Sequence, residues 1–108
     1  MASADNRRHR RFELEEPAFM RLLGPPGGAF VITILDISEQ GLRARCSRAL
    51  PEGTPIEIRC RKTMIIGEIR YARTIDASEV HLGIQATSVT GKGSDFKLTL
   101  LFPDLIRH

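Results

Sequence analysis

The chain contains six short stretches in which apolar and polar residues alternate or β-branched residues are concentrated. In residues 17–23, Phe19, Arg21 and Leu23 fall on one face of an extended strand, and Met20 and Leu22 fall on the other. Glycine and proline, which favour turns, separate these stretches. The pattern predicts an all-β barrel or sandwich with strands over residues 17–23, 29–37, 42–46, 56–60, 64–71 and 80–86.

The C-terminal stretch has two interpretations. Ser94 or Asp95 can cap a short helix that ends before Pro103. The same stretch also alternates from Phe96 to Phe102, as a strand would. We favour the helix, because the open mouth of a barrel needs a cover. The expected organisation is one domain over residues 1–108, with a flexible arginine-rich arm (1–12), a β-barrel (13–87) and a C-terminal segment (94–108).

Positive charge is concentrated near the N-terminus. The net charge is +3, but apart from four arginines in residues 7–11 twelve basic residues face thirteen acidic ones, a net charge of −1. Proteins that coat nucleic acid usually carry a basic face across the whole fold. A basic arm on a nearly neutral body is better suited to a small anionic ligand.

The remaining composition bounds the compartment and the chemistry. The chain begins with polar and arginine-rich residues and has no long apolar run, so we expect a cytoplasmic protein that does not insert into a membrane. Cys46 and Cys60 lack the spacing of metal ligands. We expect both to be small buried side chains on neighbouring strands, with no disulfide.

Two short motifs carry candidate binding chemistry. Arg7 and Arg11 form an R-x-x-x-R pair, and Asp36, Ser38 and Gly41 form the pattern D-x-S-x-x-G. Guanidinium groups grip phosphates through paired hydrogen bonds, meet the O6 and N7 atoms of guanine and stack on purines. A carboxylate accepts hydrogen bonds from the opposite edge of guanine, and glycine lets the backbone approach a ligand. Taken singly, an arginine-rich terminus is most often a solvated tail, and the second motif is most often a turn.

Together and in this order, the motifs resemble those of the PilZ domain, a small β-barrel that binds the bacterial second messenger cyclic di-GMP. The likeness extends over residues 7–87 and includes a Leu-Gly pair at Leu82 and Gly83. It implies a six-stranded antiparallel barrel and, in many members, a C-terminal helix. The ligand-binding residues that it implies are Arg7, Arg8, Arg11, Asp36, Ser38 and Gly41.

The chain departs from the family pattern at three positions. Asn6 stands where many relatives have Arg or an apolar residue, and this position influences whether one cyclic di-GMP or an intercalated pair binds. Tyr71 stands where Trp is frequent, and Ala86 where Phe is frequent. We interpret the last two as core substitutions that leave the ligand contacts intact.

The resemblance implies a cyclic di-GMP receptor that changes conformation on binding and signals to a partner protein. We expect no enzymatic activity, because neither a nucleophile–base order nor a phosphate-loop pattern is present. We also expect no cofactor and no metal, and a monomer or weak dimer. One alternative is a PilZ-fold adaptor that binds protein and no nucleotide. Another is a small barrel that binds RNA, which would need aromatic stacking platforms on its surface.

Overall fold

The computed structural model describes residues 11–38, 41–91 and 106–107. The described residues form strands joined by turns, without a helix. Residues 1–10 of the expected arm and the helix expected between residue 94 or 95 and Phe102 lie outside them. The strands are β1 (Arg11–Leu22), β2 (Ala29–Ser38), β3 (Gly41–Cys46), β4 (Pro55–Cys60), β5 (Thr63–Asp76), β6 (Glu79–Thr90) and β7 (Ile106–Arg107).

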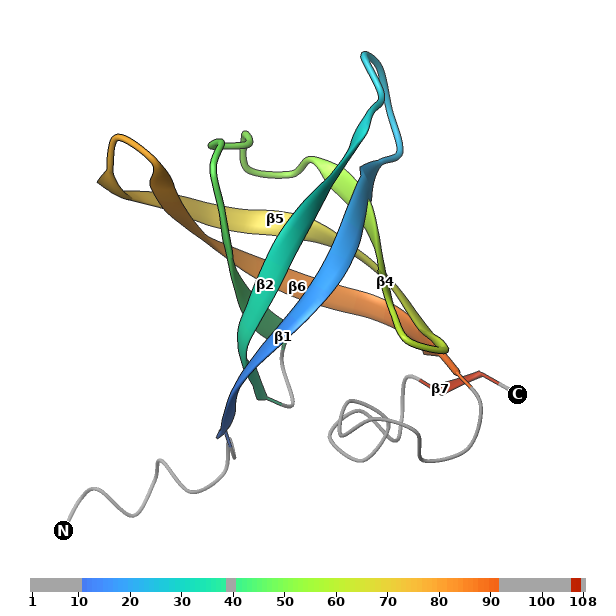
Figure 1. Ribbon diagram of the computed structural model, residues 1–108. Helices are drawn as coiled ribbons and strands as arrows, with labels where there is room; N and C mark the ends of the chain where they lie inside the picture. Colours follow the sequence, from blue (N-terminus) through green and yellow to red (C-terminus); the bar gives the residue numbers. More distant parts are fainter. Residues whose placement is uncertain (1–10, 39–40, 92–105, 108) are drawn as a thin grey trace, which may run out of the picture.

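Six of these strands close into an antiparallel barrel (Figure 1). The order around the barrel is β3-β2-β1-β4-β5-β6, and the pairing of β3 with residues 80–85 of β6 closes the ring. The short β7 lies parallel to the far end of β6, opposite Val89 and Thr90. The expected six-stranded all-β barrel is therefore confirmed, and its closure rules out the sandwich that the alternation alone left open.

The inward faces of the strands build an apolar core that is rich in isoleucine. On β1, Met20 is fully buried whereas Phe19 is 62% exposed, as the alternation predicts. Burying one large apolar side chain stabilises a fold by about 1.5–3 kcal/mol. The largest fully buried side chains are Met20, Ile32, Ile34, Ile37, Ile56, Ile58, Ile65, Ile69, Leu82 and Val89.

Three strands are much longer than the hydrophobic pattern predicts, namely β1, β5 and β6, the last of which continues to Thr90. β1 begins at Arg11, so Arg11 and Phe12 belong to the barrel and not to the arm. Charged residues at positions 13, 15 and 16 conceal the early part of this strand in the sequence. β5 continues to Asp76, and residues 71–78 are exposed. This end of the β5–β6 hairpin projects from the barrel (Figure 1), where no core imposes an apolar face.

The two cysteines are buried free thiols, as expected, but they do not lie on neighbouring strands. Cys46 ends β3, whose neighbours are β2 and β6, whereas Cys60 ends β4, whose neighbours are β1 and β5. The expectation assumed that strands adjacent in sequence pair in space, and the barrel order breaks that assumption.

Candidate functional site

The register of the barrel aligns residues of five strands into rows that run across its outer surface. One row joins Asp36 of β2 to Arg43 of β3, then to Gly83 of β6 and Tyr71 of β5. Its β1 member is Glu13. Because side chains alternate between the faces of a strand, the next row points into the core and the row after it lies outside again. That second outer row is Ser38, Gly41, Gln85 and Glu68, and the backbone of Arg11 pairs with Ser38.

Two β-bulges bring key side chains of the first row to the outside. In β2, Ile34 pairs with Ala44 and Asp36 with Arg43, so Leu35 is an extra residue. Ile34 is fully buried in the core, and simple alternation would place Asp36 in the core as well. A bulge resets the alternation by one residue. Asp36 consequently shares the outer surface with Ser38.

The Asp36 carboxylate is buried beside a single arginine. Asp36 is 5% exposed, and Nη2 of Arg43 lies 2.8 Å from its Oδ2 atom. Oδ2 makes this ion pair but no hydrogen bond among the described residues, and a carboxylate can accept several hydrogen bonds at once. The carboxylate is thus an acceptor with capacity for a donor that reaches it from outside.

Ser38 and Gly41 hold the ends of β2 and β3 together. The Ser38 hydroxyl donates a hydrogen bond of 3.4 Å to the carbonyl oxygen of Gly41, which supports the interpretation of this motif as a turn. Gly41 is required by close packing, since a Cβ atom there would lie 2.0 Å from the carbonyl oxygen of Ile84. The glycine therefore lets β3 approach β6, a role that the sequence did not predict.

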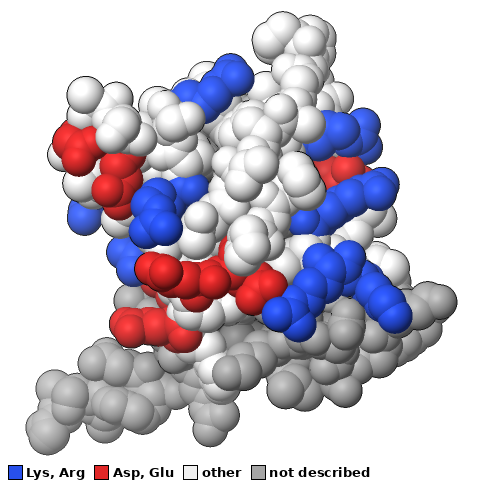
Figure 2. Space-filling view, viewed as in Figure 1, with Lys and Arg blue, Asp and Glu red and all other residues white. Residues whose placement is uncertain are grey.

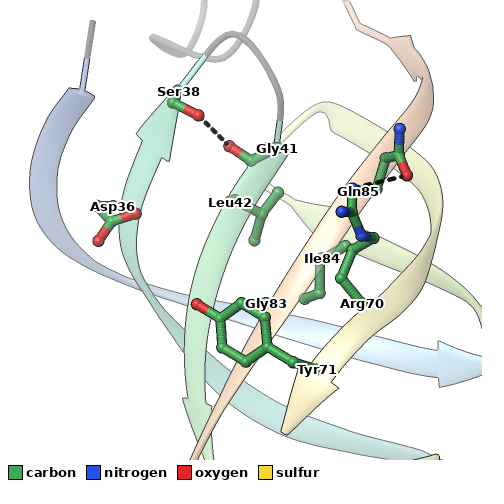
Figure 3. Close-up of a pocket in the computed structure, with 9 residues that line it drawn as sticks. All are labelled: Asp36, Ser38, Gly41, Leu42, Arg70, Tyr71, Gly83, Ile84 and Gln85. Carbon is green, nitrogen blue, oxygen red and sulfur yellow. Dashed lines mark hydrogen bonds between the residues drawn. The ribbon is translucent and has the colours of Figure 1, made fainter. Parts of the chain in front are cut away.

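The opposite wall of the site comes from β5 and β6. A bulge at Arg70 leaves both Arg70 and Tyr71 exposed, and Tyr71 is 49% exposed. The tyrosine ring lies across Gly83, where a Cβ atom would be 2.1 Å from it (Figure 3). Nη1 of Arg70 donates a 3.1 Å hydrogen bond to Oε1 of Gln85. The interpretation of Tyr71 as a core substitution is therefore wrong, because the bulge turns the ring outward.

These residues surround one open pocket of about 230 Å³ (Figure 3). Pockets that bury a whole drug-sized ligand measure roughly 300–1,000 Å³. This pocket is smaller, so it suits part of a larger ligand, such as one base of a dinucleotide. It is lined by Asp36, Ser38, Gly41, Leu42, Arg70, Tyr71, Gly83, Ile84 and Gln85.

The structure thus brings all three residues of the second motif to one pocket. Of the first motif, Arg7 and Arg8 lie outside the described residues. The backbone of Arg11 pairs with that of Ser38, so the first motif ends beside the second. Sequence reasoning missed Arg43, Arg70, Tyr71 and Gln85 as site residues. Their strand placement was visible, but the bulges that orient them leave no clear trace in the sequence.

The clear pKa shifts belong to groups outside this pocket. A hydrogen bond from Arg21 holds the pKa of Glu57 below its usual value, and the same bond raises the pKa of Arg21. A backbone hydrogen bond from Ser78 lowers the pKa of Asp76. Burial raises the pKa of the Cys46 thiol, which favours its unreactive protonated form.

The described residues contain no group of three or more His, Cys, Asp or Glu side chains that could hold a metal ion. They also contain no helix long and apolar enough to cross a membrane. In comparisons with known proteins, no family model matches the chain and no curated protein is significantly similar to it.

Proposed function

We propose that the protein is a receptor for cyclic di-GMP that acts by binding and not by catalysis. The observation that carries this proposal is the pairing of Arg11 with Ser38 and of Ser38 with Gly41. These pairings put the last arginine of the first motif beside the second motif, as a two-sided ligand site requires. The buried Asp36 carboxylate lies one outer row away.

The pocket offers complementary chemistry for one guanine. The Asp36 carboxylate can accept hydrogen bonds from the N1–H and N2–H₂ groups of the base. Aromatic side chains stack on nucleobases, and Tyr71 offers an exposed ring on the same surface. The Arg70 guanidinium can meet guanine acceptors or a phosphate. A base bound in this way would add hydrogen-bond donors to the Asp36 carboxylate beside its ion pair with Arg43.

The rest of the dinucleotide would lie outside the pocket, where the first motif can meet it. Cyclic di-GMP has two phosphates, and Arg7, Arg8 and Arg11 supply three guanidinium groups on the segment that leads into β1. In the proposed mechanism this segment closes over the ligand, and the closed surface is recognised by a partner protein. The molar ratio at saturation measures whether one cyclic di-GMP or an intercalated pair binds.

Calorimetric titration of the purified protein with cyclic di-GMP tests the proposal, and a titration with GTP is the control. We expect saturable binding that falls at least tenfold in Asp36→Asn and in Arg11→Ala. Asp76→Asn is a matched control, because it makes the same carboxylate-to-amide change at the far end of β5. Absence of binding by a folded wild-type protein would refute the receptor and favour the nucleotide-independent adaptor.

A further inference from the structure

The outer face of β1 carries its side chains in an unusual order. The exposed residues along it are Glu13, Glu15, Pro17, Phe19 and Arg21, while Ala18 and Met20 point into the core. The strand therefore runs from an acidic end through an apolar centre to a basic end. This surface lies apart from Tyr71, and its acidic end adjoins the pocket residue Asp36, with which Glu13 pairs.

The apolar centre is wider than one strand. Phe19 pairs with Val31 of β2, and the two side chains are 62% and 61% exposed. Large apolar side chains that lie together on a surface mark a site of interaction more often than single ones do. Figure 2 shows an uncharged strip with acidic atoms below it and basic atoms on both sides.

The basic end is oriented by a buried carboxylate. Oε1 of Glu57 lies 2.9 Å from Nε of Arg21 and 3.5 Å from Nε of Arg59. The Glu57 side chain is 6% exposed, whereas those of Arg21 and Arg59 are 55% and 66% exposed. Both guanidinium groups are thus fixed at their Nε atoms and extend into solvent. Two fixed arginines bind a carboxylate at a lower entropic cost than two mobile ones.

At the acidic end, the described residues hold Glu15 only loosely. The Glu15 side chain is 73% exposed, and its ion pair with Arg45 is long, at 3.9 Å. Such exposed pairs contribute about 0–1 kcal/mol. Glu15 can therefore turn to another cation at little cost, and Glu13 beside it is also exposed.

We propose that this face binds a second copy of the same chain, with the two β1 strands antiparallel across the interface. In a two-fold interface, residue i contacts residue j and j contacts i. An axis through Pro17, lying between the copies, sets Glu13 of each copy against Arg21 of the other and sets Glu15 over Phe19, beside Arg59, which pairs with Phe19. The carbon stem of Glu15 then packs on the Phe19 ring while its carboxylate reaches Arg59, and Val31 lies near Leu35 of the second copy.

Charge complementarity favours a second copy over another occupant. An acidic partner would match the arginines but would repel Glu13 and Glu15, whereas a second copy turned end for end matches both ends at once. The face measures roughly 27 Å along β1 and 14 Å across three strands. This is about half the roughly 800 Å² per partner of a standard interface. The dimer is therefore weak and forms at protein concentrations on the order of 10–1,000 μM.

Sedimentation of the ligand-free protein across this concentration range tests the proposal. We expect reversible dimerisation that weakens at least tenfold in Glu13→Arg/Glu15→Arg and in Phe19→Ala, and that weakens with added salt. Glu52→Arg is the matched control, because it reverses an exposed acidic charge in the turn before β4. Thermal unfolding verifies that each variant is folded.

Two results would overturn the dimer. One is a wild-type protein that stays monomeric at 1,000 μM, and the other is self-association that the control variant weakens as much as the test variants. Since nucleotide is absent throughout, failure of the dimer leaves the proposed receptor function untouched, and the reverse also holds.

Discussion

At the scale of single residues, the pocket glycines Gly41 and Gly83 have different roles, although a Cβ atom at either position would meet a neighbouring strand. The space above Gly41 is filled by the backbone of β6, whereas the space above Gly83 is filled by the ring of Tyr71. A backbone atom cannot move away without separating two strands, but a side chain can rotate. Substitution by alanine should therefore affect stability at one position and ligand binding at the other.

We predict that Gly41→Ala destabilises the barrel by about 1–3 kcal/mol, the usual cost of forcing an extra group into a packed site. The clash with the carbonyl oxygen of Ile84 would separate β3 from β6, the pair that closes the ring. Urea unfolding measures the change. Gly24→Ala is the control, because nothing lies within 4 Å of a Cβ atom there. Equal stability of the two variants would show that the close approach of β3 and β6 is not needed.

We predict that Gly83→Ala lowers affinity for cyclic di-GMP about tenfold, a loss equivalent to about 1.4 kcal/mol, while it changes stability little. The added methyl group displaces the Tyr71 ring from the surface on which it rests. Calorimetry and urea unfolding on the same variant separate the two effects. Tyr71→Ala should bind as weakly as Gly83→Ala, and full affinity in either variant would remove the ring from the proposed contacts.

At the scale of elements, the sequence predicted the strands whose inner face packs on the core. It did not predict the direction of side chains that a β-bulge reorients. The alternation of Phe19, Met20 and Arg21 follows the burial of one face, which hydrophobic periodicity reports directly. The outward positions of Asp36 and Tyr71 depend on bulges, in which one strand has an extra residue relative to its partner. A bulge is a property of two paired strands, and the pattern of either strand alone does not contain it.

The ion pair between β1 and β4 gives these elements a predictable response to acid. The pKa of Glu57 is lowered by its hydrogen bond from Arg21, with burial opposing the shift. A carboxyl whose pKa is lower in the folded state stabilises the fold above its ordinary pKa of 4.5, and this stabilisation is lost as the pH falls through the folded value. We predict that Glu57→Gln is less stable than wild type at pH 7 and that the difference shrinks below pH 4.5.

Urea unfolding of both proteins at pH 7 and pH 3 measures this difference. Glu52→Gln, in the exposed turn before β4, is the control and should follow wild type at both values. If the gap between wild type and Glu57→Gln were as wide at pH 3 as at pH 7, the stabilisation would come from packing of the side chain and not from its charge.

At the scale of the whole molecule, closure of the barrel assembles the pocket from strands distant in sequence. The pocket needs β2, β3, β5 and β6, and β3 meets β6 only because the sheet closes. The sequence indicated the three residues of the second motif by resemblance, because they lie within six consecutive positions. It could not identify Arg70 or Gln85, since their place beside Gly41 follows from the strand order and not from any local pattern.

The proposed closure of the arginine-rich segment over this pocket predicts a change in protease sensitivity. Trypsin cleaves after arginine and lysine, and residues 7–11 contain four arginines in front of and at the start of β1. If the ligand is gripped by Arg7, Arg8 and Arg11 while its base is held by Asp36, saturating cyclic di-GMP should slow cleavage in this segment at least tenfold. Cleavage at Arg73, near the projecting end of the β5–β6 hairpin, should keep its rate and serves as the internal reference. Equal protection at both places would indicate general stabilisation of the barrel by the ligand, and unchanged cleavage in residues 7–11 despite measured binding would show that the pocket holds the ligand without the arm.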